Sequence, residues 1–315
     1  MTQAELVEGV RAAAPRALAR ALSIVERGGA EARDLLKAVR PGGAPPHVVG
    51  LTGPPGAAKS SRADELGLEL ARREGPLAVL AVDPSSPFSG GAILGDRLRM
   101  SRLASAPGCF VRSMATRGAL GGLTAASADA VDLFAAAGFG RVMVETVGVG
   151  QDEVDVMHLA DTVVLTLPPG LGDEVQAAKA GIMEIGHIFA VTKADLPGAD
   201  EVEAHVRGML ELQPAGGWSP PVVQVAALEG RGIGRLADLV VEHRSYLAGD
   251  GRREGARRER AERRLRSAVE DLAWRTLTRN HAELVREAVD RIAAGDEDLY
   301  TAAESLLDRL IDERR

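Results

Sequence analysis

Residues 47–61, HVVGLTGPPGAAKSS, constrain the fold of this chain more than any other stretch. A short apolar run leads into a turn rich in glycine and proline, and Lys59 and Ser60 then open a helical segment rich in alanine and leucine. A strand, a glycine-rich loop and a helix in this order are typical of a phosphate-binding loop, whose backbone N–H groups surround phosphate oxygens. The predicted nucleotide contacts in this stretch are Gly53, Pro54, Pro55, Gly56, Ala57, Ala58, Lys59, Ser60 and Ser61.

Three residues of this loop have separate predicted roles. Lys59 would reach the β- and γ-phosphates, and the Ser60 hydroxyl would bind Mg²⁺. Ala58 stands where the motif G-x-x-x-x-G-K-[ST] has a glycine. If this position needs a positive φ, alanine costs about 1–2 kcal/mol, which is about tenfold or more in nucleotide affinity. Taken alone, the stretch is equally compatible with an ordinary glycine-rich turn between a strand and a helix.

Short apolar runs alternate with helical stretches from residue 48 to about residue 247. This alternation predicts βαβ units and therefore an α/β fold, with a mostly parallel, doubly wound sheet and helices on both faces. Functional residues are then expected at the carboxyl ends of the strands. The predicted strands are 48–51, 77–82, 110–112, 142–144, 162–167, 188–192 and 222–225. The predicted divisions are an N-terminal helical segment (1–45), a nucleotide-binding domain (46–247) and a C-terminal helical arm (248–315).

Carboxylates follow two of these predicted strands. Asp83 ends the second strand, Asp96 lies in the glycine-rich segment after it, and Glu145 ends the fourth strand. Carboxylate oxygens suit Mg²⁺, so these three residues and Ser60 are the predicted metal ligands, with Asp83, Asp96, Glu145 and Lys59 the predicted catalytic residues. The N–H of Gly148 would face the γ-phosphate. For Asp83 and Asp96, a role in a turn or a helix cap is an equal alternative.

The sixth predicted strand ends in Thr192, Lys193, Ala194 and Asp195, a sequence similar to the guanine-specifying motif Asn-Lys-x-Asp. Asp195 can accept hydrogen bonds from guanine N1–H and from the 2-amino group, whereas adenine offers neither donor there. Lys193 would lie over the base. Only four of the 38 basic residues are lysines, and two of these, Lys59 and Lys193, stand where a motif needs lysine. Ala226, Ala227 and Leu228 follow the last strand and are expected to meet guanine O6.

Composition narrows the class of protein. The net charge of −7 predicts no general attraction to nucleic acid. A single cysteine, Cys109, excludes an internal disulfide and a multi-cysteine metal site. No apolar run suggests a membrane span or a signal peptide, so a cytoplasmic protein is expected. Residues 252–266 are dense in arginine and glutamate, which fits either a solvated helix face or an oligomerisation arm.

Four long sequence strings give the chain a resemblance to the MeaB/ArgK family of P-loop GTPases, which includes the methylmalonic aciduria type A proteins and belongs to the SIMIBI class. These strings are AVDPSSP-x-SGGAILGDR, RSMATRGALGGL, ETVGVGQ-x-E and GDEVQAAKAGIMEI. The resemblance implies a GTP-hydrolysing chaperone that gates adenosylcobalamin loading and protects or reactivates a cobalamin-dependent acyl-CoA mutase, chiefly methylmalonyl-CoA mutase. It implies GTP, GDP and Mg²⁺ as ligands and homodimerisation through the C-terminal helices.

The resemblance also implies three switch segments. Switch I would cover residues 83–99, switch II would begin at Glu145, and a third switch over 168–179 would carry signals to the mutase through Asp173, Glu174 and Lys179. Thr192 replaces the usual asparagine of the guanine motif, which is a mild change. Direct cobalamin binding is not expected, because the signature D-x-H-x-x-G is absent.

Three other functions remain as alternatives. An ATPase or kinase associated with amino-acid transport would use ATP, against which the context of Asp195 argues. A nickel metallochaperone would carry clustered histidine or cysteine, whereas the six histidines here are scattered in the sequence. A degenerate GTPase scaffold with weak nucleotide binding would rest on Ala58 alone.

Overall fold

The structure is a computed structural model of the 315-residue chain. It describes residues 1–40, 42, 44–54, 56–84, 100–116, 122–146, 158–170, 183–212, 217–226, 229–249 and 251–312. The contact pattern divides the chain into two units, Met1–Ala256 and Arg257–Arg315. The division into three segments made from the sequence stays a prediction.

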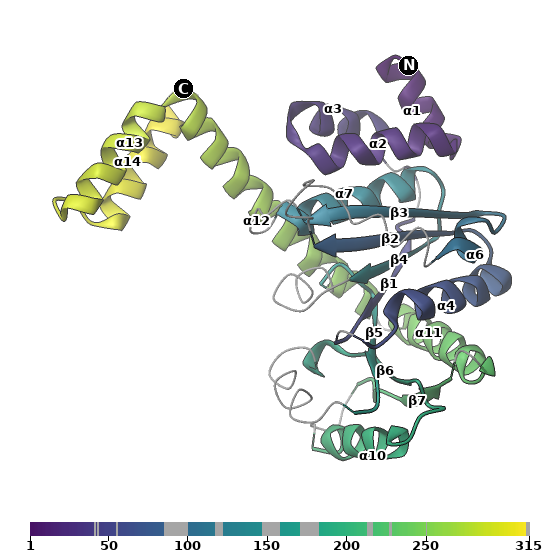
Figure 1. The fold of residues 1–315 in the computed structure, drawn as a ribbon. Helices are drawn as coiled ribbons and strands as arrows, with labels where there is room; N and C mark the ends of the chain where they lie inside the picture. The colour runs from purple at the N-terminus through teal and green to yellow at the C-terminus, as the bar shows by residue number, and fades with distance from the viewer. Residues whose placement is uncertain are drawn as a thin grey trace. The chain divides into compact units, whose positions relative to one another are not determined.

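The first unit contains a parallel seven-stranded sheet in the order β3-β2-β4-β1-β5-β6-β7 (Figure 1). The predicted α/β fold and all seven predicted strands are confirmed. Strand β1 lies between β4 and β5, where the strand order changes direction, and ligands of open α/β sheets bind at the carboxyl ends near such a point. The strands are β1 (His47–Thr52), β2 (Leu77–Pro84), β3 (Cys109–Thr116), β4 (Arg141–Thr146), β5 (Thr162–Leu167), β6 (Ile188–Thr192) and β7 (Val222–Val225).

Strand β3 is longer than the sequence predicted. It extends to Thr116, whereas the predicted strand ended at Arg112. The apolar pattern is broken there by Ser113, and β3 lies at the edge of the sheet, where a strand does not need an uninterrupted apolar run.

Alternate residues of the central strands face two different helical layers. Leu80 of β2 belongs to the core cluster that includes helices α1, α2, α3 and α7, whereas Val79 belongs to the cluster that includes α4, α6 and α11. Because side chains alternate across a strand, the sheet is covered on both faces, as predicted. Helix α10 shares a core cluster with β5, β6 and β7, to which these strands contribute Leu165, Phe189 and Val222. The helices of this unit are α1 (Gln3–Arg11), α2 (Pro15–Arg27), α3 (Gly29–Val39), α4 (Lys59–Glu74), α6 (Ser101–Ala104), α7 (Gly122–Ala136), α10 (Ala199–Leu210) and α11 (Ile233–Ala248).

The N-terminal helices are joined to the edge strand by a carboxylate. Glu26 of α2 accepts hydrogen bonds from the backbone N–H of Ala115 (3.0 Å) and from the Arg112 guanidinium (3.2 Å) on β3. An edge strand presents unpaired backbone donors, and Glu26 satisfies one of them. Gly28, with φ of 71°, ends α2 and begins α3.

Three histidines that are distant in sequence meet at the amino ends of the strands. The hydroxyl of Thr162, at the start of β5, lies 2.9 Å from Nε2 of His47 and 2.8 Å from Nδ1 of His243 on α11. The ring of His187 lies 4.5 Å from that of His243, and Trp218 packs edge-on against the same ring. Burial lowers the pKa of His47 to about 4 and that of His243 to about 3, so both rings are neutral at pH 7.

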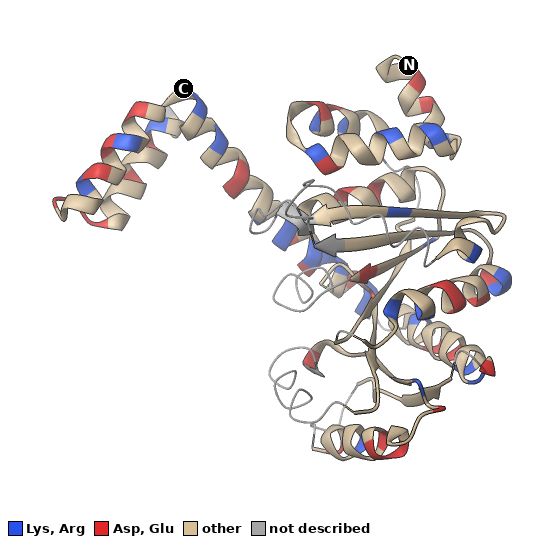
Figure 2. Ribbon diagram, in the orientation of Figure 1, with Lys and Arg blue, Asp and Glu red and all other residues tan. Residues whose placement is uncertain are grey.

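The second unit contains most of α12 (Arg252–Asn280), together with α13 (Ala282–Ala294) and α14 (Leu299–Asp312). Gly295, with φ of 79°, ends α13. Figure 2 shows charged residues on these helices as on those of the first unit, whereas most of the strand length carries none. Large apolar side chains are nevertheless exposed here: Leu265, Val269, Leu272, Trp274, Leu284, Val289, Leu299, Tyr300, Leu307 and Ile311. Throughout the described ranges, no helix is both long enough and apolar enough to cross a bilayer.

Candidate nucleotide-binding site

The predicted phosphate loop connects β1 to α4 at the carboxyl edge of the sheet. Gly53 has φ of 147°, and a Cβ there would lie 2.1 Å from the carbonyl oxygen of Thr166 on β5. Only glycine therefore fits at this position, because any side chain would collide with backbone. Gly56 adds a second positive φ, of 77°, while Pro55 lies outside the described residues.

Ala58 adopts the left-handed conformation, with φ of 55° and ψ of 41°, immediately before α4. The cost predicted for this alanine depended on a positive φ, and the structure meets that condition. Left-handed backbone costs about 1–2 kcal/mol for a residue with a Cβ. The loop thus keeps the backbone path that a glycine would favour and carries strain at the residue before Lys59.

Lys59 is buried inside this loop. Its ammonium group donates to the carbonyl oxygen of Gly53 and, at 3.4 Å, to that of Pro54. The charge therefore lies among the backbone atoms that surround a bound phosphate in such loops. This placement agrees with the predicted contact between Lys59 and the β- and γ-phosphates.

Ser60 and Glu145 meet although they are 85 residues apart in sequence. The parallel register aligns Leu51 of β1 with Glu145 of β4, and α4 begins just beyond β1. The Ser60 hydroxyl donates to Oε1 of Glu145 at 2.7 Å, and the Glu145 side chain is fully buried. A hydroxyl and a carboxylate side by side are hard oxygen donors, so these two residues fit Mg²⁺.

The other predicted metal and switch residues lie wholly or partly outside what the structure describes. The backbone of Asp83 pairs with Ala115 of β3 near the end of β2, but its side chain lies outside what the structure describes. The following predicted residues lie outside the described ranges altogether: Asp96, Gly148, Asp173, Glu174, Lys179, Ala227 and Leu228.

Buried threonine hydroxyls support the end of β1, a feature that the sequence analysis missed. Thr166 of β5 donates to the backbone carbonyl of Thr52 at 2.9 Å, and Thr146 of β4 donates to the Thr52 hydroxyl at 3.1 Å. These bonds fix the point from which the phosphate loop leaves the sheet. The signal in the sequence was a threonine at or near the end of each central strand, where an apolar residue is usual.

The predicted base-reading residues lie at the ends of β6 and β7. The backbone N–H of Ala194 donates to Val225 at 3.2 Å, which places the two loops next to each other. Lys193 has φ of 53°, and Asp195 is exposed. Ala226 is buried and pairs with Arg231 through two backbone hydrogen bonds of 3.0 Å. The structure therefore brings Lys193, Asp195 and Ala226 to one edge, as the guanine motif requires.

Thr192 and Arg62 are buried, and each has one side-chain polar atom with no hydrogen-bond partner among the described residues. Thr192 is fully buried, and its hydroxyl makes no hydrogen bond within that part of the chain. Arg62, in the first turn of α4, was missed by the sequence analysis. The sequence signal for Arg62 was its spacing. It lies four residues before Leu66 and eight before Leu70, on the apolar stripe of a helix.

Comparison with known proteins gives a match over most of the chain. The family described as "Methylmalonyl Co-A mutase-associated GTPase MeaB" matches residues 18–282. A protein of Pyrococcus abyssi, provisionally named a GTPase, is 43% identical over 316 residues, which cover 98% of this chain and 96% of that protein.

Two further proteins are similar in sequence or structure. The mitochondrial "Methylmalonic aciduria type A homolog" of Mus musculus is 38% identical over 208 residues, covering 64% of this chain and 50% of that protein. A solved structure described as a "LAO/AO transport system kinase" superposes with a TM-score of 0.72 at 25% identity, covering 98% of this chain and 97% of that one.

Proposed function

The chain belongs to the MeaB family of methylmalonyl Co-A mutase-associated GTPases, and we propose that it is a Mg²⁺-dependent chaperone of an adenosylcobalamin-dependent acyl-CoA mutase, most simply methylmalonyl-CoA mutase. It is a P-loop GTPase, which binds guanine nucleotide and hydrolyses GTP to GDP and phosphate. The observation that carries the assignment is the convergence of Lys59, Ser60 and Glu145 at the carboxyl ends of β1 and β4.

Hydrolysis on this framework depends on positioning and charge neutralisation. The buried ammonium of Lys59 stabilises negative charge that develops on the phosphate oxygens, and the loop N–H groups hold them in place. Ser60 and Glu145 would hold Mg²⁺, which when bound neutralises further phosphate charge. Glu145 can also orient water, because its carboxylate lies fully buried next to the loop. Asp83 and Asp96 are proposed as further ligands.

The proposed partner is recognised through the segment that contains Asp173, Glu174 and Lys179. We expect Lys179→Ala to leave intrinsic GTP hydrolysis intact and to reduce the stimulation of hydrolysis by methylmalonyl-CoA mutase about tenfold, since truncating one important interface residue typically costs more than about 1 kcal/mol. Phosphate release measured with and without purified mutase tests this, and Lys37→Ala on α3 is the matched control. A loss of intrinsic hydrolysis as large as that of Lys59→Ala would place Lys179 in the nucleotide site instead.

A homodimer is proposed through the second unit. Apolar side chains such as Trp274, Val289 and Tyr300 are exposed on its helices, and surfaces of this kind are typical of protein interfaces. We expect sedimentation equilibrium of the full chain to give twice the monomer mass of 33.0 kDa. A monomer at micromolar concentration would contradict the proposal.

A transport-associated kinase is the second candidate, favoured by the name of the similar solved structure. It predicts ATP binding as tight as GTP binding and transfer of phosphate to a protein. Competition between ATP and GTP for the purified chain separates the two. A degenerate scaffold would bind neither nucleotide tightly.

A further inference from the structure

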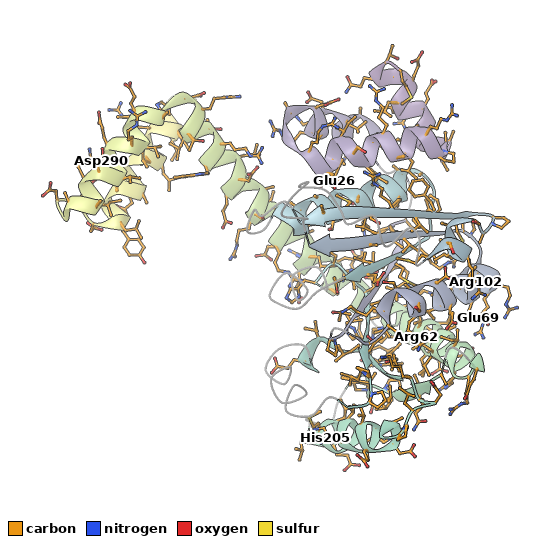
Figure 3. All side chains as sticks on the ribbon, in the orientation of Figure 1. Glu26, Arg62, Glu69, Arg102, His205 and Asp290 are labelled. Carbon is orange, nitrogen blue, oxygen red and sulfur yellow. The ribbon has the colours of Figure 1, made fainter. Side chains whose placement is uncertain are left out.

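Arg231 joins the two loops that carry the predicted base-reading residues. These loops leave β6 and β7, adjacent strands that pack beside α10, which His205 marks in Figure 3. Nη2 of Arg231 donates to the backbone carbonyl of Ala194 at 3.2 Å. Ala194 lies between Lys193 and Asp195 in the guanine motif. An arginine from outside the motif therefore bonds to the backbone in its middle.

Both backbone polar groups of Ala194 bond to residues at or after the end of β7. Its N–H donates to the carbonyl oxygen of Val225 at 3.2 Å, and its carbonyl accepts from Arg231. That carbonyl and the N–H of Asp195 belong to one planar peptide group, so the bond to Arg231 fixes the plane from which the Asp195 side chain starts. Lys193 has φ of 53°, and left-handed backbone is costly for a residue with a Cβ unless its surroundings hold it. The bonds to Ala194 supply part of that support.

The backbone of Arg231 is itself held in place. It exchanges two hydrogen bonds of 3.0 Å with the backbone of Ala226. A glycine stands on each side of it, with φ of 67° at Gly230 and 85° at Gly232. A Cβ at Gly232 would lie 2.1 Å from the carbonyl oxygen of Gln224, so that position requires glycine. The turn therefore holds the Arg231 side chain within reach of the loop that follows β6.

A surface ion pair does not account for this arrangement. Arg231 is exposed, and its Nε lies 3.3 Å from Oε2 of Glu229, which is also exposed. Exposed ion pairs of this kind contribute little to stability, because water screens both charges. The bond to Ala194, in contrast, acts on the residue next to the proposed base reader.

We propose that Arg231 is a positioning residue for guanine specificity, which orients the peptide between Ala194 and Asp195 so that the Asp195 carboxylate faces the base. The inference rests on the proposed role of Asp195 as the base reader. Guanine offers N1–H and the 2-amino group to the two oxygens of that carboxylate, and hydrogen bonds weaken steeply when their angles are poor. The orientation of this peptide therefore affects the choice of base more than the stability of the fold.

The experiment compares the affinities for GDP and inosine diphosphate, since the base of the latter lacks the 2-amino group. Arg231→Met removes the donor and keeps the length of the side chain. It should reduce the ratio of the GDP affinity to the inosine diphosphate affinity about fivefold, the size expected from one hydrogen bond. Asp195→Ala should abolish the preference for GDP. In the Asp195→Ala background, Arg231→Met should leave that ratio unchanged.

Arg235→Met is the matched control. The Arg235 side chain is 54% exposed, against 52% for Arg231, and it pairs with Glu242 on its own helix α11. Its replacement should leave the ratio of affinities unchanged. Arg231→Lys keeps a donor and should restore part of the preference for GDP. Both affinities come from one preparation, so a lower folded fraction does not alter their ratio.

Three results overturn the proposal. An unchanged GDP preference in Arg231→Met, or an equal change in both backgrounds, means that Arg231 does not act through Asp195, while the base assignment stands. A comparable loss of preference in Arg235→Met would assign the effect to surface charge. A GDP preference that survives Asp195→Ala removes the base assignment itself, and the role of Arg231 with it.

Discussion

At the carboxyl ends of β1 and β4 the buried groups include the charged side chains of Lys59 and Glu145. At the amino ends of β1 and β5, two neutral histidines lie near one buried carboxylate, Asp161, which accepts a hydrogen bond from the N–H of Val48 at 2.9 Å. Lys59 and Glu145 are buried beside the strained backbone of Ala58. At the opposite end, His47 and His243 share the hydroxyl of Thr162, and burial keeps both rings uncharged at pH 7.

The difference reflects what each end does. Buried polar groups that hydrogen-bond to one another cost less to bury, so the amino end can join β1, β5 and α11 through its own hydrogen bonds. Buried charge and left-handed backbone are costly and persist where the surrounding structure holds them and function needs them. The comparison predicts that changes at one end alter catalysis and that changes at the other alter stability.

The largest expected effect is that of Lys59→Ala. Removing a charge that stabilises the transition state should lower kcat/KM for GTP about a thousandfold, or roughly 4 kcal/mol. The free energy of unfolding should change by less than about 1 kcal/mol, because the desolvation cost of the buried ammonium offsets its hydrogen bonds. Single-turnover hydrolysis and urea unfolding measure the two quantities. A large loss of stability would show that the charged end also holds the fold.

Low pH is expected to destabilise the protein through the histidines at the amino ends of the strands. The unfolded chain protonates its histidines near pH 6.5, whereas His47 and His243 resist protonation until about pH 4 and 3. Their contribution to stability is therefore complete above pH 6.5 and is lost as the pH falls toward those values. Between pH 7 and 5.5 we expect the free energy of unfolding to fall by roughly 2–3 kcal/mol.

Two variants test whether His47 causes part of this pH dependence of stability. His47→Gln should be less stable at pH 7 but should lose about half of the acid sensitivity in urea titrations. His205→Gln, on the exposed surface of α10, should leave the sensitivity unchanged. Equal acid sensitivity in His47→Gln and the wild type would contradict the assignment to this histidine.

The smallest effect is expected from Ala58→Gly. Relief of about 1–2 kcal/mol of backbone strain should tighten GDP and GTP binding about tenfold. Stability should change less, because glycine also increases the entropy of the unfolded chain. Ala13→Gly is the matched control, since Ala13 has φ of 52° outside the nucleotide site and its replacement should not alter affinity. Unchanged calorimetric affinities of Ala58→Gly would mean that the loop accommodates alanine without cost to binding.

Much of the fold follows from contiguous residues. The seven strands were predictable because each is a short apolar run between turn signals. The phosphate loop and the motif ending in Asp195 were predictable for the same reason, since each combines a strand end with a fixed spacing of a few residues.

What only the tertiary structure decided is which distant residues meet. The bond between Ser60 and Glu145 depends on β4 lying next to β1, and the contact of His47 with Thr162 spans 115 residues. The burial of Arg62 depends on which side of α4 faces the sheet. Local sequence determines a strand or a turn through short-range sterics and hydrophobic periodicity. The pairing of strands is set by burial summed over the whole domain, so the chemistry at each end of the sheet emerges only when the chain is folded.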